Sequence, residues 1–232
     1  MEPDQQPDHW SLHENDVNLE DLLLSLWRAR PGGTESDCYW DNWGFTIYRT
    51  AYGGDTNQAW QTLLKKIEDD VAAECAYYKE YREAHSSVKL KNPEAADKFI
   101  SLFKMDPRSN PDLLNDATME QVREIYQKGV GGPPIVHQTP QYHLFLLADA
   151  EVLSAIAKGE FWMKCVQGTY KAEDHYVKDY SGVQTMKLAY HGYIKMTVQS
   201  LLVLWDRLAI RHLEELSPTY LEEPLRIWDG DW

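Results

Sequence analysis

The arginine of the segment Trp43–Tyr52 is the residue whose type and position most suggest chemistry. The segment alternates along a predicted strand, which places Phe45, Ile47 and Arg49 on one face. A guanidinium that is always charged needs a carboxylate or a bound anion when it lies on an apolar face. We therefore expect Arg49 to hold a ligand carboxylate or enolate as a catalytic residue. Two structural alternatives are an ion pair with an acid of the next helix and a bend that returns Arg49 to solvent.

Aromatic side chains gather around the same strand and could line a pocket. Tyr48 lies on the face opposite Arg49 and is a candidate for moving a proton. The residues that we expect to contact a ligand are Trp40, Trp43, Tyr52 and Tyr193. Ordinary packing of a sheet accounts for these aromatic residues equally well.

Two histidines are candidates for a general base, because the pKa of imidazole suits proton transfer near neutral pH. His143 and His191 both lie at the ends of predicted strands. Neither of these two histidines belongs to a His-x-x-x-His or His-x-Asp pattern of the kind that brings metal ligands together. We therefore predict no metal site.

Motifs for covalent catalysis and for nucleotide binding are absent from the sequence. No Gly-x-Ser-x-Gly elbow occurs, and Gly129–Pro134 lacks the Gly-Lys-Ser/Thr ending of a phosphate loop. The same glycine- and proline-rich stretch could be a hinge or lid, although a plain connector explains it as well. We predict that the protein uses no cofactor.

The hydrophobic pattern predicts the elements that position these residues. Strands are expected at Trp43–Tyr52, His143–Ala148, Phe161–Tyr170 and Tyr193–Gln199. A long helix is expected after Gly53-Gly54, Asp149 is expected to cap a helix through Ala157, and Thr118 to open another. This order favours an α+β fold: a mixed or antiparallel sheet in a ferredoxin-like arrangement, with helices on one face.

The chain divides into three parts on the same grounds. Residues 1–17 are polar and acidic, and we expect them to be disordered. Residues 18–217 form one domain, in which the interrupted helical pattern of about residues 89–129 is interpreted as a helical insertion. Residues 218–232 are predicted to be an irregular, tryptophan-rich tail.

The charge of the chain limits its partners. A formal net charge of −14 would repel a phosphate backbone or an anionic membrane, so neither nucleic acid nor membrane is expected as a partner. Its apolar runs fall far short of the ~20 residues that span a bilayer. Cys38, Cys75 and Cys165 form no Cys-x-x-Cys pair, which is typical of free thiols in a reducing compartment. We expect a cytoplasmic protein, and a nuclear one is an open alternative.

Three segments resemble a broad family of uncharacterised proteins from filamentous fungi. The first is Trp43-Gly-Phe-Thr-Ile-Tyr-Arg-Thr-Ala-Tyr-Gly53, followed by Trp60 at helical distance. The others are Phe145–Asp149 and Tyr193–Ser200, which are similar to later strands of that family. The resemblance covers about half of the chain and implies a fungal intracellular protein. It implies no activity, cofactor or site residue.

Two functions are compatible with these observations. The first is a cofactor-independent enzyme of the isomerase or cyclase type, or a binding protein, with an aromatic pocket for a small apolar or carboxylate-bearing ligand. The second is a non-catalytic protein that binds a protein partner or forms a homodimer through its tryptophan-rich ends.

Overall fold

The structure is a computed structural model that describes residues 17–29, 38–85, 94–135, 143–178, 184–186, 190–217 and 226–230. The segment that is predicted to be disordered lies outside these ranges except for Val17, and so does most of the predicted C-terminal tail.

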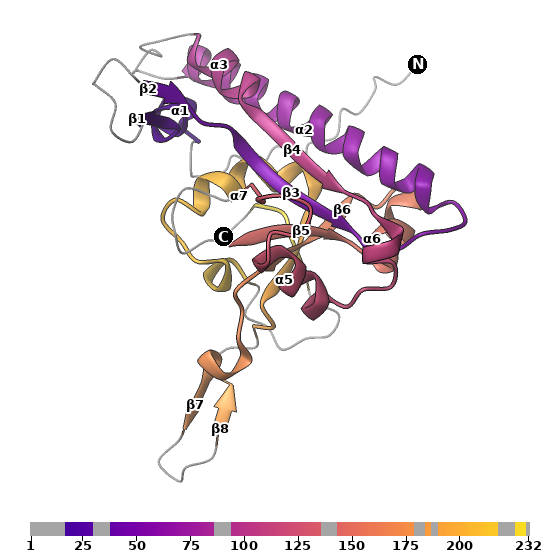
Figure 1. The fold of residues 1–232 in the computed structure, drawn as a ribbon. Helices are drawn as coiled ribbons and strands as arrows, with labels where there is room; N and C mark the ends of the chain where they lie inside the picture. Colours follow the sequence, from indigo (N-terminus) through magenta and orange to yellow (C-terminus); the bar gives the residue numbers. More distant parts are fainter. Residues whose placement is uncertain are drawn as a thin grey trace, which may run out of the picture.

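A mixed sheet of six strands forms the centre of the fold, in the order β10-β9-β6-β5-β3-β4. Figure 1 labels four of these strands, β3, β4, β5 and β6. The strands are β3 (Trp43–Arg49), β4 (Phe103–Arg108), β5 (Leu144–Ala148), β6 (Trp162–Gln167), β9 (Tyr193–Thr197) and β10 (Ile227–Trp228). β3 runs parallel to β4 on one side and to β5 on the other, whereas β6 runs antiparallel to both β5 and β9. β10 is parallel to β9. The prediction of a mixed sheet is confirmed.

Helices and two small hairpins surround the sheet. The α-helices are α1 (Leu19–Ser25), α2 (Thr56–His85), α3 (Ala95–Ser101), α4 (Pro111–Leu114), α5 (Met119–Gln127), α6 (Ala150–Ala157) and α7 (Leu201–Arg207). The 3₁₀ helices are η1 (Ala172–His175), η2 (Val198–Ser200) and η3 (Leu213–Leu216). The hairpins are β1 (Trp27–Ala29) with β2 (Cys38–Trp40), and β7 (Tyr176–Lys178) with β8 (Gln184–Met186), the latter projecting from the body of the fold (Figure 1). Of the helices in the described ranges, none has the length and apolar composition needed to cross a bilayer.

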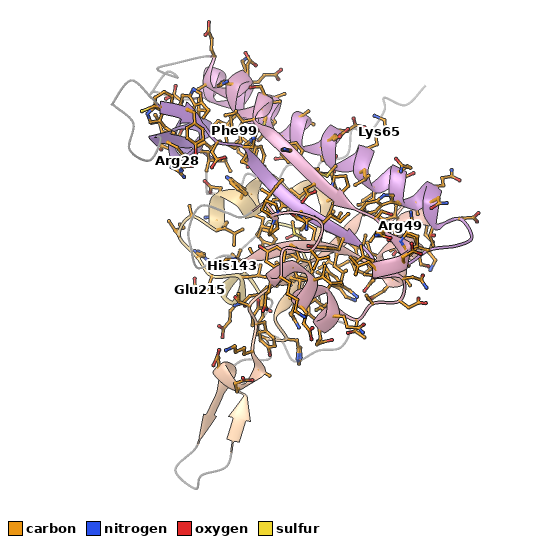
Figure 2. The ribbon with its side chains drawn as sticks, in the orientation of Figure 1. Arg28, Arg49, Lys65, Phe99, His143 and Glu215 are labelled. Carbon is orange, nitrogen blue, oxygen red and sulfur yellow. The ribbon has the colours of Figure 1, made fainter. Side chains whose placement is uncertain are left out.

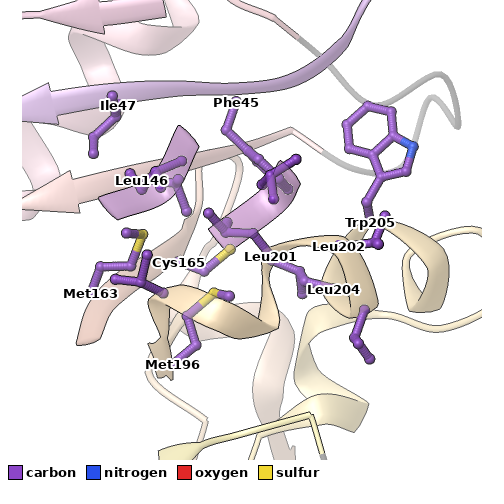
Figure 3. Close-up of a cluster of buried hydrophobic side chains, with 14 of the residues drawn as sticks. Phe45, Ile47, Leu146, Met163, Cys165, Met196, Leu201, Leu202, Leu204 and Trp205 are labelled. Carbon is purple, nitrogen blue, oxygen red and sulfur yellow. The ribbon is translucent and has the colours of Figure 1, made fainter. Parts of the chain in front are cut away.

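The two faces of the sheet bury different helices. On one face, α1, α2, α3, α6 and α7 close over a large core, part of which is shown in Figure 3. On the other face, α4 and α5 cover a small core. The buried members of this small core are Tyr48, Leu114, Val122, Tyr126, Phe145, Leu147 and Val166. Helices therefore pack on both faces, and the expected placement on one face is not confirmed.

The ferredoxin-like arrangement is not confirmed either. Three neighbouring strands, β4, β3 and β5, are parallel, and parallel strands require crossover connections rather than hairpins. The crossover from β3 to β4 passes over the large core through α2 and α3. The crossover from β4 to β5 passes over the small core through α4 and α5. Hydrophobic periodicity shows that a helix has an apolar face, but it does not show which face of a sheet receives it.

The alternation predicted for the first strand is confirmed over Trp43–Arg49, where every residue is buried. Phe45 and Ile47 point into the large core, and Tyr48 points into the small core. The strand ends at Arg49, earlier than predicted, and the chain then turns through Gly53 and Gly54 with positive φ angles of 91° and 53°. These angles suit glycine because it has no Cβ.

Local capping explains where two helices begin. The Asp149 side chain accepts a hydrogen bond from the backbone N–H of Val152, which confirms the predicted start of α6. Thr118 and Gln121 form a reciprocal capping box at the start of α5, where a helix is also predicted.

Two strands of the six-stranded sheet are found where the sequence analysis predicts none. β4 lies within the interrupted helical pattern of residues 89–129, and it contains Pro107, which is tolerated because β4 is an edge strand. β10 consists of two residues of the predicted irregular tail, and its Trp228 side chain is completely buried. The sheet is therefore wider than the sequence pattern indicates.

The three cysteines are free thiols, and their environments predict different reactivity. Burial raises the pKa of Cys75 to about 12 and also raises the pKa of Cys165, so neither forms the reactive thiolate at neutral pH. Cys38 is only half-buried. We expect a disulfide-exchange reagent to label Cys38 alone in the native protein and all three thiols after denaturation, as counted by intact mass. Rapid native labelling of Cys165 would contradict this packing.

Candidate functional site

The chain leaves the carboxyl ends of β3 and β4 in opposite directions. β3 continues into α2 on the face of the large core, whereas β4 continues into α4 and α5 on the face of the small core. In open sheets with parallel strands, ligands bind outside the carboxyl ends of the strands, where neighbouring connections diverge. The last pair in register between these strands is Tyr48 with Arg108. This pair is therefore the natural place to look for a site.

The Arg108 guanidinium connects several elements at this point. It forms an ion pair with Asp106, in which Nη2 lies 2.7 Å from Oδ2, and its Nη1 donates to the Tyr48 hydroxyl over 3.1 Å. It also donates to the carbonyls of Val130 and Pro133 over 3.0 and 3.2 Å. Arg108 thus holds the segment Gly129–Ile135, which we call the Gly-Pro segment, against the sheet.

A second contact fastens the same segment. The backbone N–H of Ile135 donates to the Thr46 hydroxyl over 2.8 Å, and that hydroxyl donates to the Asp106 carboxylate over 3.0 Å. Gly129, Gly131 and Gly132 have φ angles of 62°, 88° and 111°. Backbone of this kind is available to glycine at little steric cost, so the segment can change its path at several positions.

Tyr48 is 1% exposed, and its ring lies 5.3 Å from the ring of Phe145. Burial raises the pKa of Tyr48, while the nearby Arg108 charge and its hydrogen bond act in the opposite direction without cancelling the shift. The hydroxyl therefore stays protonated at neutral pH, where it can donate a hydrogen bond or a proton but cannot serve as a base.

Tyr126 of α5 brings a second hydroxyl to the small core. Its side chain is 2% exposed, and its Oη has no hydrogen-bond partner among the described residues. Burial raises the pKa of Tyr126, the Tyr48 and Cys165 side chains add to that effect, and Arg108 opposes it. A buried polar atom without a partner costs free energy, and such atoms often mark the position of a water molecule or a ligand.

A pocket of about 380 Å³ lies on the other side of the Gly-Pro segment, between α4 and α5. Its lining residues are Leu113, Asn115, Ala117, Gln121, Glu124, Ile125, Lys128 and Val130. Its volume falls within the range of about 300–1,000 Å³ that is typical of small-molecule sites. Val130 connects this pocket with Arg108, since it lines the pocket while its carbonyl accepts a hydrogen bond from Arg108. Between Asn115 and Ala117, Asp116 adopts a positive φ of 55°, which is unusual for a residue other than glycine.

Arg49 lies on the opposite face, beside the start of α2 (Figure 2), and is 4% exposed. Its Nε donates to the Ala51 carbonyl, and its Nη2 donates to the side chains of Thr56 and Asn57 over 3.0 and 2.7 Å. The guanidinium carbon lies 4.5 Å from the ring centre of Tyr52, whose hydroxyl donates to the Arg49 carbonyl. Within the described ranges no carboxylate pairs with Arg49, so the alternative of an ion pair with an acid of the next helix is not found, and neutral oxygen atoms accept the hydrogen bonds of Arg49.

The two candidate histidines lie at the other end of the strands, before the amino ends of β5 and β9. His143 directly precedes β5, and the carbonyl of His191, which precedes β9, accepts a hydrogen bond from Arg123 of α5. Figure 2 shows His143 far from Arg49 along the strands. Because β3 and β5 are parallel, the five residues of β5 separate the end of the strands near His143 from the end near Tyr48 and Arg49 by roughly 17 Å. The ring of His143 lies 6.5 Å from that of Tyr126, so His143 borders the small core, but it is no neighbour of Arg49.

The predicted ligand-binding aromatics divide between the two faces. Tyr52 and Tyr193 pack against the small core together with Tyr48. Trp43 is fully buried in the large core, where its Nε1 donates to the Phe99 carbonyl over 2.7 Å and its ring stacks on that of Phe99. Trp40 packs against the large core and, edge to face, against Trp27. These two tryptophans are therefore not neighbours of Tyr48.

Sequence reasoning did not single out Arg108, Tyr126 or the α4–α5 pocket. A signal for the strand that carries Arg108 was nevertheless available. It is the alternation of charged and apolar residues, with Lys104, Asp106 and Arg108 on one side and Phe103 and Met105 on the other.

The described residues contain no group of three or more His, Cys, Asp or Glu side chains placed to hold a metal ion.

Comparison with models of protein families found no match, and neither the curated proteins nor the solved structures gave a significant one. The resemblance to the fungal family therefore stays a prediction, and the function has to be argued from the geometry alone.

Proposed function

We propose that the protein binds a small molecule with an apolar body and a carboxylate in the pocket between α4, α5 and the Gly-Pro segment. The observation that carries this proposal is the double role of Val130, which lines the pocket and accepts a hydrogen bond from Arg108. A ligand that moves Val130 therefore acts directly on the Arg108–Tyr48 pair.

The pocket provides both kinds of contact that such a molecule needs. Leu113 and Val130 are 41% and 38% exposed, so an apolar group that covered them would bury surface that now faces water. Lys128, whose side chain is 67% exposed, is held by Glu124 in an ion pair that faces water and costs little to rearrange, so it need not obstruct a ligand that enters the pocket.

Arg108 and Tyr48 are the groups proposed to act on the ligand itself. Movement of the Gly-Pro segment breaks the contacts of Arg108 with Val130 and Pro133 and frees two donor positions of the guanidinium. Arg108 would then bind a carboxylate or enolate oxygen, and Tyr48 would donate a hydrogen bond to it. Isomerisation or cyclisation suits this set of groups, because these reactions require a shaped pocket and oriented donors.

Arg108→Lys tests this function. We expect phenylacetate, as a small aromatic carboxylate, to bind the native protein and to bind the variant at least about 10-fold more weakly, because Lys lacks the planar fork of donors. Binding is measured by calorimetry and by NMR shifts of the Val130 amide. Arg28→Lys is the matched control, since Arg28 lies at the far end of the molecule from the carboxyl ends of β3 and β4 (Figure 2).

The measurement also has an outcome that ends the proposal. A folded Arg108→Lys variant that binds phenylacetate as tightly as Arg28→Lys does would remove Arg108 from ligand binding. Failure of a broad panel of small carboxylates to shift the Val130 amide in the native protein would remove the pocket itself.

A further inference from the structure

Two lysines lie directly opposite each other on neighbouring strands. Lys164 of β6 and Lys195 of β9 are partners in the antiparallel register, and both side chains are nearly buried, at 9% and 13% exposed. Like charges in this position oppose each other and destabilise a sheet unless an anion lies between them. Buried lysines are rare in proteins for a different reason, since removing an unpaired charge from water costs free energy.

The anion between the lysines is the side chain of Glu151. One carboxylate oxygen lies 2.7 Å from the Lys164 ammonium and the other lies 2.6 Å from the Lys195 ammonium. Lys164 also contacts Asp149, whose other oxygen caps α6. Burial alone would raise the pKa of Glu151, but the hydrogen bonds from the two lysines outweigh it and lower that pKa. Hydrogen bonds from Asp149 and Glu151 likewise raise the pKa of Lys164 in spite of its burial, so Glu151 and Lys164 are both charged at neutral pH.

Glu151 differs from the lysines in its exposure. Its side chain is 50% exposed and comes from the first turn of α6, so it can rotate into water without unfolding the helix. The lysines cannot leave, because they project from the middle of the sheet beside the rings of Tyr193 and Trp162, at 5.9 and 4.9 Å from the ring centres. The fixed part of this cluster is thus cationic, and the exchangeable part is a carboxylate.

We propose that Lys164 and Lys195 form a binding site for a compact oxyanion such as a phosphate group, and that Glu151 occupies this site until the ligand displaces it. Asp149 pairs with Lys164 alone, whereas Glu151 bridges the two ammonium groups, so the place of Glu151 is the one that an oxyanion would take. The site does not depend on the function proposed above. Along the row of paired residues Arg108, Tyr48, Leu147 and Lys164, three strand spacings of ~4.8 Å separate it from Arg108, or roughly 14 Å.

The test uses Glu151→Gln in the full chain with inorganic phosphate as the probe. Glutamine has the shape of glutamate but no charge, so it no longer competes for the ammonium groups. We expect phosphate to bind Glu151→Gln about 10-fold more tightly than it binds the native protein, by calorimetry at constant ionic strength. Glu160→Gln is the matched control, because it removes one exposed negative charge close to α6 without touching either lysine.

Two results would overturn the site. One is a folded Glu151→Gln variant whose phosphate affinity equals that of Glu160→Gln, since the lysine pair would then be a purely structural ion cluster. The other does not depend on whether Glu151→Gln folds. It is the finding that the native protein and Lys195→Gln bind phosphate equally. We expect Lys195→Gln to lose at least about 10-fold in phosphate affinity, and the Lys164 ammonium resonance to stop responding to phosphate.

Discussion

Gly44→Ala is expected to lower the free energy of unfolding by about 4 kcal/mol, the combined cost of overpacking and of a strained backbone angle. Gly44 has a φ of 134° and lies opposite Lys104 in the parallel pair of β3 and β4. A Cβ at this position would lie 1.9 Å from the Lys104 carbonyl oxygen. The obstacle is backbone, so β4 would have to move away from β3. Urea denaturation followed by circular dichroism measures the loss.

Gly53→Ala is the control for this prediction. Gly53 also has a positive φ, of 91°, but a Cβ there would meet no atom within 4 Å. We expect this variant to lose only the backbone strain of an L-residue, about 1–2 kcal/mol. Equal losses for the two variants would mean that the close approach of β3 and β4 is not what requires glycine at position 44.

Arg49→Lys is expected to lower the free energy of unfolding by about 3 kcal/mol, because hydrogen bonds to a charged group contribute about 1.5–3 kcal/mol each and Lys cannot make all of those of Arg49. The guanidinium contacts Ala51, Thr56 and Asn57 at once, and so fixes the turn between β3 and α2. A protein of this size should show a fall of roughly 6–12 °C in thermal midpoint.

The same variant separates a structural role of Arg49 from a role in ligand binding. We expect phenylacetate affinity, measured below the unfolding transition, to be unchanged, because the guanidinium of Arg49 is held by Ala51, Thr56 and Asn57 and does not line the α4–α5 pocket. Arg28→Lys should leave stability within about 0.5 kcal/mol of the native value, as substitutions on the surface usually do. A stable Arg49→Lys variant that has lost affinity would restore Arg49 as a ligand-binding residue.

The strands that the sequence predicts are those whose burial is regular. The residues of β3 alternate between the two cores, and β5 is a short apolar run covered on both faces. In both strands the sequence pattern therefore follows directly from which side chains are buried. The start of α6 is predictable for a different reason, since an Asp side chain at a helix N-terminus acts within its own turn. Information of this local kind is available without the fold.

The candidate site could not be predicted because it depends on an edge strand. Only one side of β4 pairs with the sheet, and three of its six residues are charged, so its pattern is too weak to indicate a strand. Because β4 is not predicted, Arg108 at its end is not predicted as a site residue either. The sequence correctly places Tyr48 within a strand and His143 at the start of one, but whether the two lie at the same end of the sheet depends on strand direction, which no local pattern records.

The two borders of the sheet limit how copies of this protein can associate. On one border, Pro107 of β4 has no N–H to offer to an incoming strand, and the charged side chains of Lys104 and Arg108 flank it. On the other border, β10 is only two residues long. Neither border is a good template for a further strand, so a sheet that continues from one molecule into the next is disfavoured, as is growth into fibrils. Among the described residues, Trp27 and Ile210 are exposed apolar side chains that are available for association instead.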